Sequence, residues 1–352
     1  MFFGLIKIAS SSVIGVDLGS SSIKAMVISK THDAYQIEAV AETLLPKGLI
    51  VDNHLQDINK ISLIIKQLYK NFPSHYKHAA IAVTGADVIT KMMSMNTNLS
   101  ELELENQVQM EVEKNVSFSL DELFIDFEVL GPSHIDPSIN NVLVSTARKE
   151  QVLSQVQSVD GSGLITTIVD VASHALSRAI SFILSPEDYH NGIVVIDIGA
   201  SQMMLNILYQ GQVIFNRSKN HGGEVCTQMI ADHYGLSFLE AENMKISQRY
   251  PSDCEIDVLI PFMNITTDYL CSDLRMFTNG SNQIELTKVV LTGGGALMSG
   301  LIGQLQKALE IEVVLAKPKT DFVFSRDADK HLINESGAKY MIALGLALRG
   351  II

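Results

Sequence analysis

Two stretches of this chain share one pattern, an apolar strand that ends in Asp-x-Gly and is followed by small residues. The first reads Ile14-Gly-Val-Asp-Leu-Gly-Ser-Ser and the second reads Val194-Val-Ile-Asp-Ile-Gly-Ala-Ser, with the two aspartates 180 positions apart. A second apolar strand returns after each turn, over Ile23–Ile28 and Met203–Leu208. Because self-similarity of this kind marks an internal duplication, the pattern predicts a chain of two related lobes.

The first Asp-x-Gly turn contains the parts of a phosphate-binding loop. Asp17 ends the strand, Gly19 allows a ligand to approach the backbone closely, and Lys24 adds a positive charge on the return strand. The residues whose N–H groups and hydroxyls can line a phosphate are Ser20, Ser21 and Ser22.

The second turn offers the same parts without the lysine, at Asp197, Gly199, Ala200 and Ser201. One such turn alone would be an ordinary hairpin. Two turns that face each other predict a clamp on a polyphosphate, in which Asp17 and Asp197 hold Mg²⁺ through water.

A glycine-rich turn forms the third motif, in the segment Leu291-Thr-Gly-Gly-Gly-Ala-Leu-Met-Ser-Gly300. It lies between a strand predicted over Lys288–Leu291 and a helix predicted over Leu301–Leu309. Without Cβ atoms, the backbone of Gly293, Gly294 and Gly295 lets a flat group lie directly on it. The spacing is not the GxGxxG of a βαβ unit, so a dinucleotide site is disfavoured.

A block with its own cycle of elements interrupts the first lobe. Strands are predicted over Val88–Met95, Leu123–Leu130 and Asn141–Thr146, and helices over Leu99–Lys114 and Lys149–Val159. Ser100 and Glu103 form a capping box at the start of the first of these helices. After the block a strand over Ile165–Val171 and a helix over Ala175–Leu184 resume the lobe.

We therefore expect three parts in the chain. The first lobe comprises residues 1–86 with 164–190 and 336–352, the inserted module comprises residues 87–163, and the second lobe comprises residues 191–335. The boundary between the lobes falls in the polar stretch Pro186–Asn191.

Charge and cysteine usage restrict the partners and the compartment. A net charge of −13 argues against a nucleic-acid or anionic-lipid surface, because both are polyanions. The cysteines are separate and show no metal-ligand spacing, which indicates free thiols in a reducing compartment. The apolar opening Met1–Ala9 is too short to span a bilayer and is expected to be a packing or contact arm. The sequence predicts a cytoplasmic protein that is not transmembrane.

No set of side chains in the sequence identifies catalytic residues. The histidines do not cluster, and His174 is expected to pack in the core rather than to act in catalysis. Met92, Met93 and Met95 are expected to fill a core, with an adaptable peptide-docking surface as the alternative.

The order of the motifs resembles the superfamily of actin, Hsp70 and the sugar kinases, which has a ribonuclease H-like fold. Tyr340-Met-Ile-Ala-Leu-Gly-Leu-Ala-Leu348 and Ile168-Val-Asp-Val-Ala-Ser-His-Ala175 are similar to its two connecting motifs. The resemblance implies a two-lobed, actin-like α/β fold that binds ATP and Mg²⁺. The two hairpins would be its phosphate loops, and the three glycines would hold the adenosine.

Within this superfamily the chain resembles the PilM family of type IV pilus assembly proteins over nearly its whole length. The resembling stretches include Leu45–Asp52, Ile81–Lys91, Leu102–Val108, Asp126–Gly131, Ala147–Glu150, Gly222–Thr227 and Ala241–Lys245. The inserted module is similar to the extra subdomain that this family shares with the division protein FtsA. By this resemblance Glu242 and Lys245 would reach the ribose, and Gly222 and Gly223 would lie against the nucleotide.

The same resemblance implies a function and a partner. A PilM-like protein is a cytoplasmic adaptor that docks the N-terminal cytoplasmic tail of the inner-membrane protein PilN and reaches the membrane through it. Other pilus platform proteins or the assembly ATPase are further expected partners. We expect the tail to bind between the inserted module and the lobe that carries Asp17, where it could extend a strand edge such as Val88–Met95.

Two departures from the family pattern bear on turnover. The chain has Thr84 where the family carries Pro, and Ala172 where it carries an acidic residue that positions attacking water. We therefore expect slow ATP hydrolysis or none, with Asp170 as the candidate substitute.

Two other functions stay open. A sugar-type kinase of the same superfamily would need a carboxylate base and a polar sugar-binding cluster, which the apolar strands and acidic helices of the insert do not suggest. An FtsA-like filament former typically ends in an amphipathic membrane helix, whereas Arg349-Gly-Ile-Ile352 directly follows the last core helix.

Overall fold

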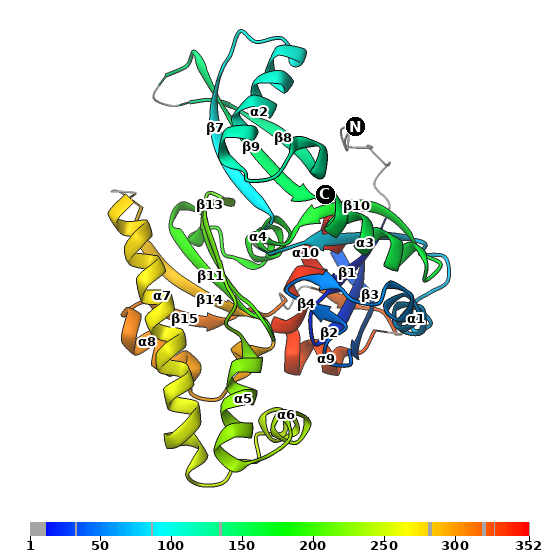
Figure 1. Ribbon diagram of the computed structural model, residues 1–352, viewed down its shortest axis with the longest axis vertical. Helices are drawn as coiled ribbons and strands as arrows, with labels where there is room; N and C mark the ends of the chain where they lie inside the picture. The colour runs from blue at the N-terminus through cyan, green and yellow to red at the C-terminus, as the bar shows by residue number, and fades with distance from the viewer. Residues whose placement is uncertain are drawn as a thin grey trace.

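The computed structural model describes residues 12–31, 34–85, 87–133, 136–280, 284–318, 322–326 and 328–351. Two twisted sheets lie side by side with helices between and around them, and a smaller module projects from one end (Figure 1). The expected contact arm Met1–Ala9 lies outside the described residues.

The two large sheets repeat one topology. The first has the order β10-β6-β1-β2-β3-β16 and the second has the order β13-β12-β11-β14-β15. In each, a central strand pairs in antiparallel fashion with the next strand of its hairpin and in parallel with a strand from much later in the chain. The duplication that the sequence predicts is therefore confirmed, and the fold is α/β and two-lobed.

The strands of the first sheet are β1 (Ile14–Leu18), β2 (Ser22–Thr31), β3 (Ala34–Leu44), β6 (His78–Val83), β10 (Ile165–Val171) and β16 (Val323–Phe324). Those of the second are β11 (Gly192–Ile198), β12 (Met203–Tyr209), β13 (Gln212–Lys219), β14 (Leu286–Thr292) and β15 (Glu312–Leu315). A small hairpin, β4 (Ile50–Val51) with β5 (His54–Leu55), follows β3. The ends of the predicted strands agree with these bounds to within two residues, except that β2 ends at Thr31, three residues after the predicted Ile28.

Helices fill three layers around the sheets. α1 (Ile58–Tyr69) and α3 (Lys149–Asp160) cover the outer face of the first sheet, and α4 (Ala172–Ile183) and α10 (Met341–Arg349) lie between the sheets. α5 (Gly223–Tyr234), α7 (Ile260–Gly280) and α8 (Leu301–Leu309) cover the second sheet, and α6 (Phe238–Ser247) packs on α5. α9 (Lys330–Ser336) precedes α10.

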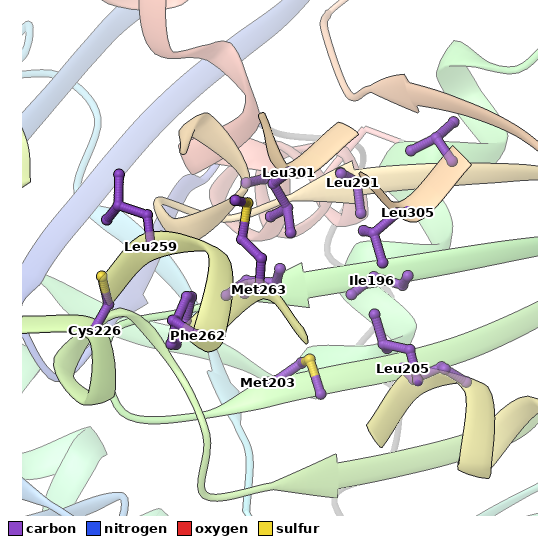
Figure 2. Close-up of a cluster of buried hydrophobic side chains, with 14 of the residues drawn as sticks. Ile196, Met203, Leu205, Cys226, Leu259, Phe262, Met263, Leu291, Leu301 and Leu305 are labelled. Atoms are coloured by element: carbon purple, nitrogen blue, oxygen red, sulfur yellow. The ribbon is translucent and has the colours of Figure 1, made fainter. Parts of the chain in front are cut away.

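Successive side chains of a β-strand point to opposite faces of the sheet, so they enter different hydrophobic cores. In β11, Ile196 joins the outer core with α5, α7 and α8, whereas Val195 joins the core between the sheets. Figure 2 shows the outer core, in which the side chain of Met263 in α7 extends toward Leu301 of α8. Burial on both faces of the sheets explains their nearly continuous apolar sequences.

The layer between the sheets is packed unusually closely. A Cβ on Gly15 of β1 would lie 2.2 Å from the carbonyl oxygen of Ala343 in α10. A Cβ on Gly345 of α10 would lie 1.8 Å from the carbonyl oxygen of Ala175 in α4. Glycine at these two positions lets α10 approach both β1 and α4.

The inserted module is a three-stranded sheet with a helix on one face. Its strands β7 (Ile89–Asn96), β9 (Ile139–Arg148) and β8 (Leu123–Pro132) pair in that order, and α2 (Glu101–Asn115) covers the face that contains Met95, Val142 and Val144. The capping box at Ser100 and Glu103 is confirmed. α3, by contrast, packs against α1, and its Val159 joins the core of the first lobe.

The predicted start of α4 was wrong by three residues. The helix begins at Ala172 rather than at Ala175, directly after β10 ends at Val171. Val171 occupies the cap position and makes no side-chain capping bond, so the sequence lacks the Ser, Thr, Asp or Asn that usually marks a helix start.

Among the described helices, none is both long and apolar enough to cross a membrane.

Gly345→Ala should destabilise the protein by ~1–3 kcal/mol, because the new methyl group would force α10 away from α4. Gly303→Ala in α8 is the matched control, since no atom lies within 4 Å of the position of its Cβ. That variant should be as stable as the native chain or up to ~1 kcal/mol more stable, because alanine favours the helix. Urea midpoints measure both effects, and equal midpoints for the two variants would contradict the packing argument.

Candidate functional site

The two Asp-x-Gly turns meet between the lobes, in a region around Asp17, Lys24 and Asp197 that we call the cleft. The hydroxyl of Ser201, after β11, donates to the hydroxyl oxygen of Ser20, after β1, at 2.9 Å. A second contact joins the lobes, because the Lys47 ammonium of the first lobe lies 3.2 Å from the ring centroid of Phe238 in α6. The turns thus face each other, as a clamp requires.

The first turn is built around an ion pair. Asp17 and Lys24 are register partners on β1 and β2, and the Lys24 ammonium lies 3.1 Å from the Asp17 carboxylate. Burial lowers the pKa of Lys24, but the carboxylates of Asp17, Glu42 and Asp197 outweigh it and the pKa is raised overall. Lys24 therefore stays charged inside the cleft.

The second turn has a carboxylate without a lysine of its own. Met204 stands opposite Asp197 in the register of β11 and β12, in the place that Lys24 has opposite Asp17. Burial, together with the negative charge of Asp17, raises the pKa of Asp197 to about 7, although Lys24 partly offsets this. Two carboxylates that repel each other in a buried cleft favour a bound cation, and oxygen ligands suit Mg²⁺.

The three glycines after β14 differ in what surrounds them. A Cβ on Gly293, whose φ is +85°, would lie 2.4 Å from the carbonyl oxygen of Ile198, and one on Gly295 would lie 2.4 Å from the Ile198 side chain. Gly294 meets no atom closer than the Lys339 Cε at 4.0 Å. The outer glycines are thus required for packing on the end of β11, and the middle one leaves an open surface for a flat group.

Gly222 and Gly223 join the second turn to α5. A Cβ on Gly222 would lie 2.5 Å from the carbonyl oxygen of Ala200, so this approach needs a glycine. The Gly223 N–H donates to the carbonyl oxygen of Gly199 at 2.9 Å. The start of α5 is therefore fixed to the second turn by backbone contacts.

Glu242 and Lys245 lie one turn apart on α6 and form an ion pair of 2.7 Å. The Lys245 ammonium also donates to the Gly223 carbonyl oxygen at 2.9 Å and to the Thr227 hydroxyl at 2.7 Å, while Thr227 donates to Glu242. The pair is not a freely solvated helix pair, because it fastens α6 to the start of α5 beside the second turn.

Two charged residues of the cleft were missed from the sequence. Glu42 of β3 is the register partner of Lys24, and the Lys339 ammonium, just before α10, lies 3.5 Å from the Glu42 carboxylate. Lys339 is also the nearest side chain to the open surface of Gly294. A cross-strand pairing of β2 with β3 would have revealed Glu42, but no local pattern marks Lys339.

Ala172, at the position expected from the family resemblance to place the attacking water, offers no carboxylate and is 3% exposed in the first turn of α4. The suggested substitute, Asp170, accepts a hydrogen bond from the Arg178 guanidinium at 2.9 Å and one from the Val171 N–H at 2.8 Å. Its carboxylate is thus engaged, and Asp170 lines a cavity whose lining does not include Ser20 or Ser201.

This cavity has a volume of about 670 Å³ and lies between the inserted module and both lobes. One wall is formed by β8 and β9 of the module, and the other by β10, α4 and Arg349. The turn between β12 and β13 closes one end, where the Ser177 hydroxyl donates to the Gly211 carbonyl oxygen at 3.1 Å. Its volume is within the range of ligand pockets.

Charged groups of both signs line this cavity. Asp126 and Glu128 are exposed on β8, but the surrounding cavity wall partly removes water from the Asp126 carboxylate and raises its pKa, despite the Phe127 N–H and Arg349, which both lower it. His174, which the sequence analysis assigned to packing, lines the cavity from α4. Burial lowers the pKa of His174 and favours the neutral ring.

Comparisons with known proteins give one family and one fold. The family model described as type IV pilus assembly protein PilM matches residues 15–351. The cell division protein FtsA of Bacillus subtilis (strain 168) is 23% identical over 377 residues, which cover 95% of this chain and 82% of FtsA.

Among solved structures, the PilM–PilN type IV pilus biogenesis complex matches with a TM-score of 0.86 and 24% identity, over 97% of this chain and 99% of that chain. MreB5 of Spiroplasma citri bound to AMPPNP matches with a TM-score of 0.51 and 13% identity, over 96% of each chain. The actin-like fold expected from the sequence is confirmed.

Asp197→Asn should change how stability depends on pH. The pKa of Asp197 is about 7 in the folded chain but roughly 3.9 in an unfolded one. Between these two pH values the folded chain keeps a proton on Asp197 that the unfolded chain has lost. The stabilisation is therefore complete below about pH 4, and the free energy of unfolding falls as the pH rises to about 7. The free energy of unfolding of the variant should rise relative to that of the native chain across this window and then stay level.

Urea titrations at several pH values, without nucleotide or Mg²⁺, measure this difference. Asp268→Asn on the exposed face of α7 is the control, because it removes one carboxylate without touching the cleft. Parallel pH profiles for the Asp197 and Asp268 variants would refute the assignment.

Proposed function

Because the chain belongs to the PilM family of type IV pilus assembly proteins, we propose that it is an ATP-binding adaptor that docks the cytoplasmic N-terminal tail of PilN. Membrane recruitment would then occur through PilN, at the cytoplasmic face of the inner membrane. The observation that carries this proposal is the cavity beside the inserted module, which is separate from the clamp between the lobes. An adaptor needs two such sites, one for the nucleotide and one for a partner.

In the proposed clamp the phosphates lie between the two Asp-x-Gly turns. Lys24 supplies a positive charge to them, and Asp17 and Asp197 hold Mg²⁺ through its water ligands. Adenosine would rest on Gly294 with Lys339 beside it, and Lys245 and Glu242 would reach the ribose. This arrangement uses the open glycine surface and leaves the packed glycines Gly293 and Gly295 in their structural role.

The proposed hydrolysis rate is low. Alanine at position 172 cannot position water, and Asp170 is bonded to Arg178. Nucleotide binding would then serve to hold the lobes in one arrangement rather than to drive rapid turnover.

The proposed tail site is the cavity. In the three-stranded sheet of the module, β7 and β8 are both edge strands, but most module residues that line the cavity come from β8 and β9, with Met92 from β7. We therefore place the extended tail along β8 rather than along β7, where the sequence analysis suggested it. Edge strands offer backbone N–H and C=O groups that an added strand can pair with.

The charge of the residues that line the cavity also favours the PilN tail as its occupant. Short cytoplasmic segments next to a membrane span carry an excess of Lys and Arg. Asp126 and Glu128 are exposed on β8, and the chain as a whole has a net charge of −13. Attraction between a basic tail and this acidic strand would assist encounter. The PilM–PilN type IV pilus biogenesis complex contains a chain with the same fold as this one.

Asp17→Asn and Asp197→Asn should each weaken binding of Mg·ATP by ~1–3 kcal/mol, because each removes a charged partner of the bound ion. Isothermal titration calorimetry with ATP in the presence and absence of Mg²⁺ measures the effect, which should shrink without Mg²⁺. Asp268→Asn is the control and should bind as the native chain does. Unchanged affinity in both cleft variants would reject the clamp.

Removal of residues 89–146 should abolish binding of the tail and preserve binding of ATP. Ile89 and Thr146 are register partners, so a short Gly-Ser linker can join Val88 to Ala147. The deletion spares α3, whose Val159 is part of the first lobe's core, and the 3.8 Å ion pair of Arg148 with Asp87.

Fluorescence anisotropy of a labelled synthetic PilN tail from the same organism measures capture, and ATP binding reports that the deletion variant is folded. Leu102→Ser and Met110→Ser, on the exposed face of α2, are the controls and should bind the tail normally. A folded deletion variant with native tail affinity would place the docking site elsewhere.

A further inference from the structure

One contact between the lobes plays no part in the proposed clamp. The Lys47 ammonium of the first lobe lies 3.2 Å from the ring centroid of Phe238, the first residue of α6 in the second lobe. Lys47 belongs to Leu45–Asp52, one of the stretches that resemble the PilM family. Because a cation over an aromatic face is attracted by the ring quadrupole, this contact favours the arrangement in which the lobes are close.

The backbone presents Lys47 at the tip of a tight turn. The Leu49 N–H donates to the Pro46 carbonyl oxygen at 3.3 Å, and the φ of Gly48 is +86°, as the third residue of a type II turn requires. The side chains of Leu45 and Leu49, on either side of the tip, are buried in the core of the first lobe. Lys47 is therefore an exposed side chain on a backbone that is fixed at both ends.

This turn is bonded to the first of the two Asp-x-Gly turns. The Leu45 N–H donates to the Ser21 carbonyl oxygen at 2.8 Å. Ser21 follows Ser20, whose hydroxyl accepts the hydrogen bond from Ser201 of the second lobe. The position of Lys47 is thus coupled to that of the first phosphate turn through one short stretch of backbone.

Phe238 is connected to the second Asp-x-Gly turn in a similar way. Ser237 caps α6 directly before Phe238 and fixes the first turn of the helix. From the last turn of α6, the Lys245 ammonium donates to the Gly223 carbonyl oxygen at 2.9 Å. The Gly223 N–H in turn donates to the Gly199 carbonyl oxygen at 2.9 Å. The contact of Lys47 with Phe238 therefore joins two supports, each of which holds one phosphate turn.

We propose that Lys47 and Phe238 form a latch between the lobes, which holds the two phosphate turns around a bound nucleotide and slows its release. This inference rests on the proposed binding of nucleotide in the clamp and adds the residues that set how long it stays. For phosphates to leave from between the turns, the turns must separate. Their supports then separate with them, and the contact between Lys47 and Phe238 is broken. Both are positioning residues, since they act through the turns rather than on the nucleotide.

Lys47→Ala and Phe238→Leu should each raise the dissociation rate of nucleotide about twofold to fivefold, the effect expected from the loss of an exposed cation–π contact. The double variant should release nucleotide no faster than the faster single variant, because both changes break the same contact. Lys47→Arg and Phe238→Tyr, which keep the cation and the ring, should release it at the native rate. Stopped-flow displacement of a fluorescent N-methylanthraniloyl derivative of ATP by excess ATP, with Mg²⁺ present, measures these rates.

Lys30→Ala is the matched control. The Lys30 ammonium lies 5.2 Å from the ring centroid of Tyr35, so it makes the same kind of contact within the first lobe alone. Its loss should leave the dissociation rate unchanged. The thermal midpoint without nucleotide is measured for all variants and should change little in Lys47→Ala, because this side chain is exposed. Faster release at an unchanged midpoint is a result that a residue needed only for folding would not give.

The outcomes separate the latch from the clamp on which it rests. If the native chain does not bind the labelled nucleotide, both are overturned. If it binds, but Lys47→Ala or Phe238→Leu releases nucleotide at the native rate, the clamp stands and the latch is rejected. Additive effects in the double variant would also reject the latch, because Lys47 and Phe238 would then act separately. Equal acceleration in Lys30→Ala would reject it as well, since a contact within one lobe cannot hold two lobes together.

Discussion

The close packing of α10 against β1 and α4 is the constraint on which the rest of the molecule depends. Both contacts require a residue without a side chain, which is Gly15 in the contact with β1 and Gly345 in the contact with α4. They hold one layer of helices between the two sheets, in a core that draws Met26 from the first sheet and Val195 from the second. With the sheets fixed on a shared layer, the turns after β1 and β11 come together at Ser20 and Ser201. Larger side chains in this helix layer would separate the two Asp-x-Gly turns.

The same layer places a second site on its other side. One face of α4 packs in the core with Leu176 and Ile180, and another presents His174 and Ser181 to the cavity. The two sites differ in electrostatic character. In the cleft, burial and the nearby charge of Asp17 raise the pKa of Asp197, and two carboxylates so placed suit a cation. In the cavity, Arg178 of α4 is paired with Asp170, whereas Asp126 and Glu128 of β8 are exposed, which suits a basic partner.

Much of the fold could be predicted because its signals are local. The duplicated hairpins, the capping box at Ser100 and the strand over Ile165–Val171 each depend on neighbouring residues, and all are confirmed. The start of α4 was missed because no capping residue marks it. Of the candidate nucleotide residues, the sequence named both turns and the glycines, and their assignment to ATP stays a prediction.

The sequence by itself determined the two-lobed actin-like architecture, the family and the residues of the facing turns, because strand patterning and glycine positions are written in consecutive residues. Only the tertiary structure decided that Gly293 and Gly295 serve packing while Gly294 stays open, and that Glu42 and Lys339 join the cleft. It alone also brought Thr146 and Ser181 to one cavity without hydrogen-bond partners among the described residues. Whether a buried polar atom has a hydrogen-bond partner depends on which distant segments of the chain pack against it, and a local sequence pattern does not predict that packing.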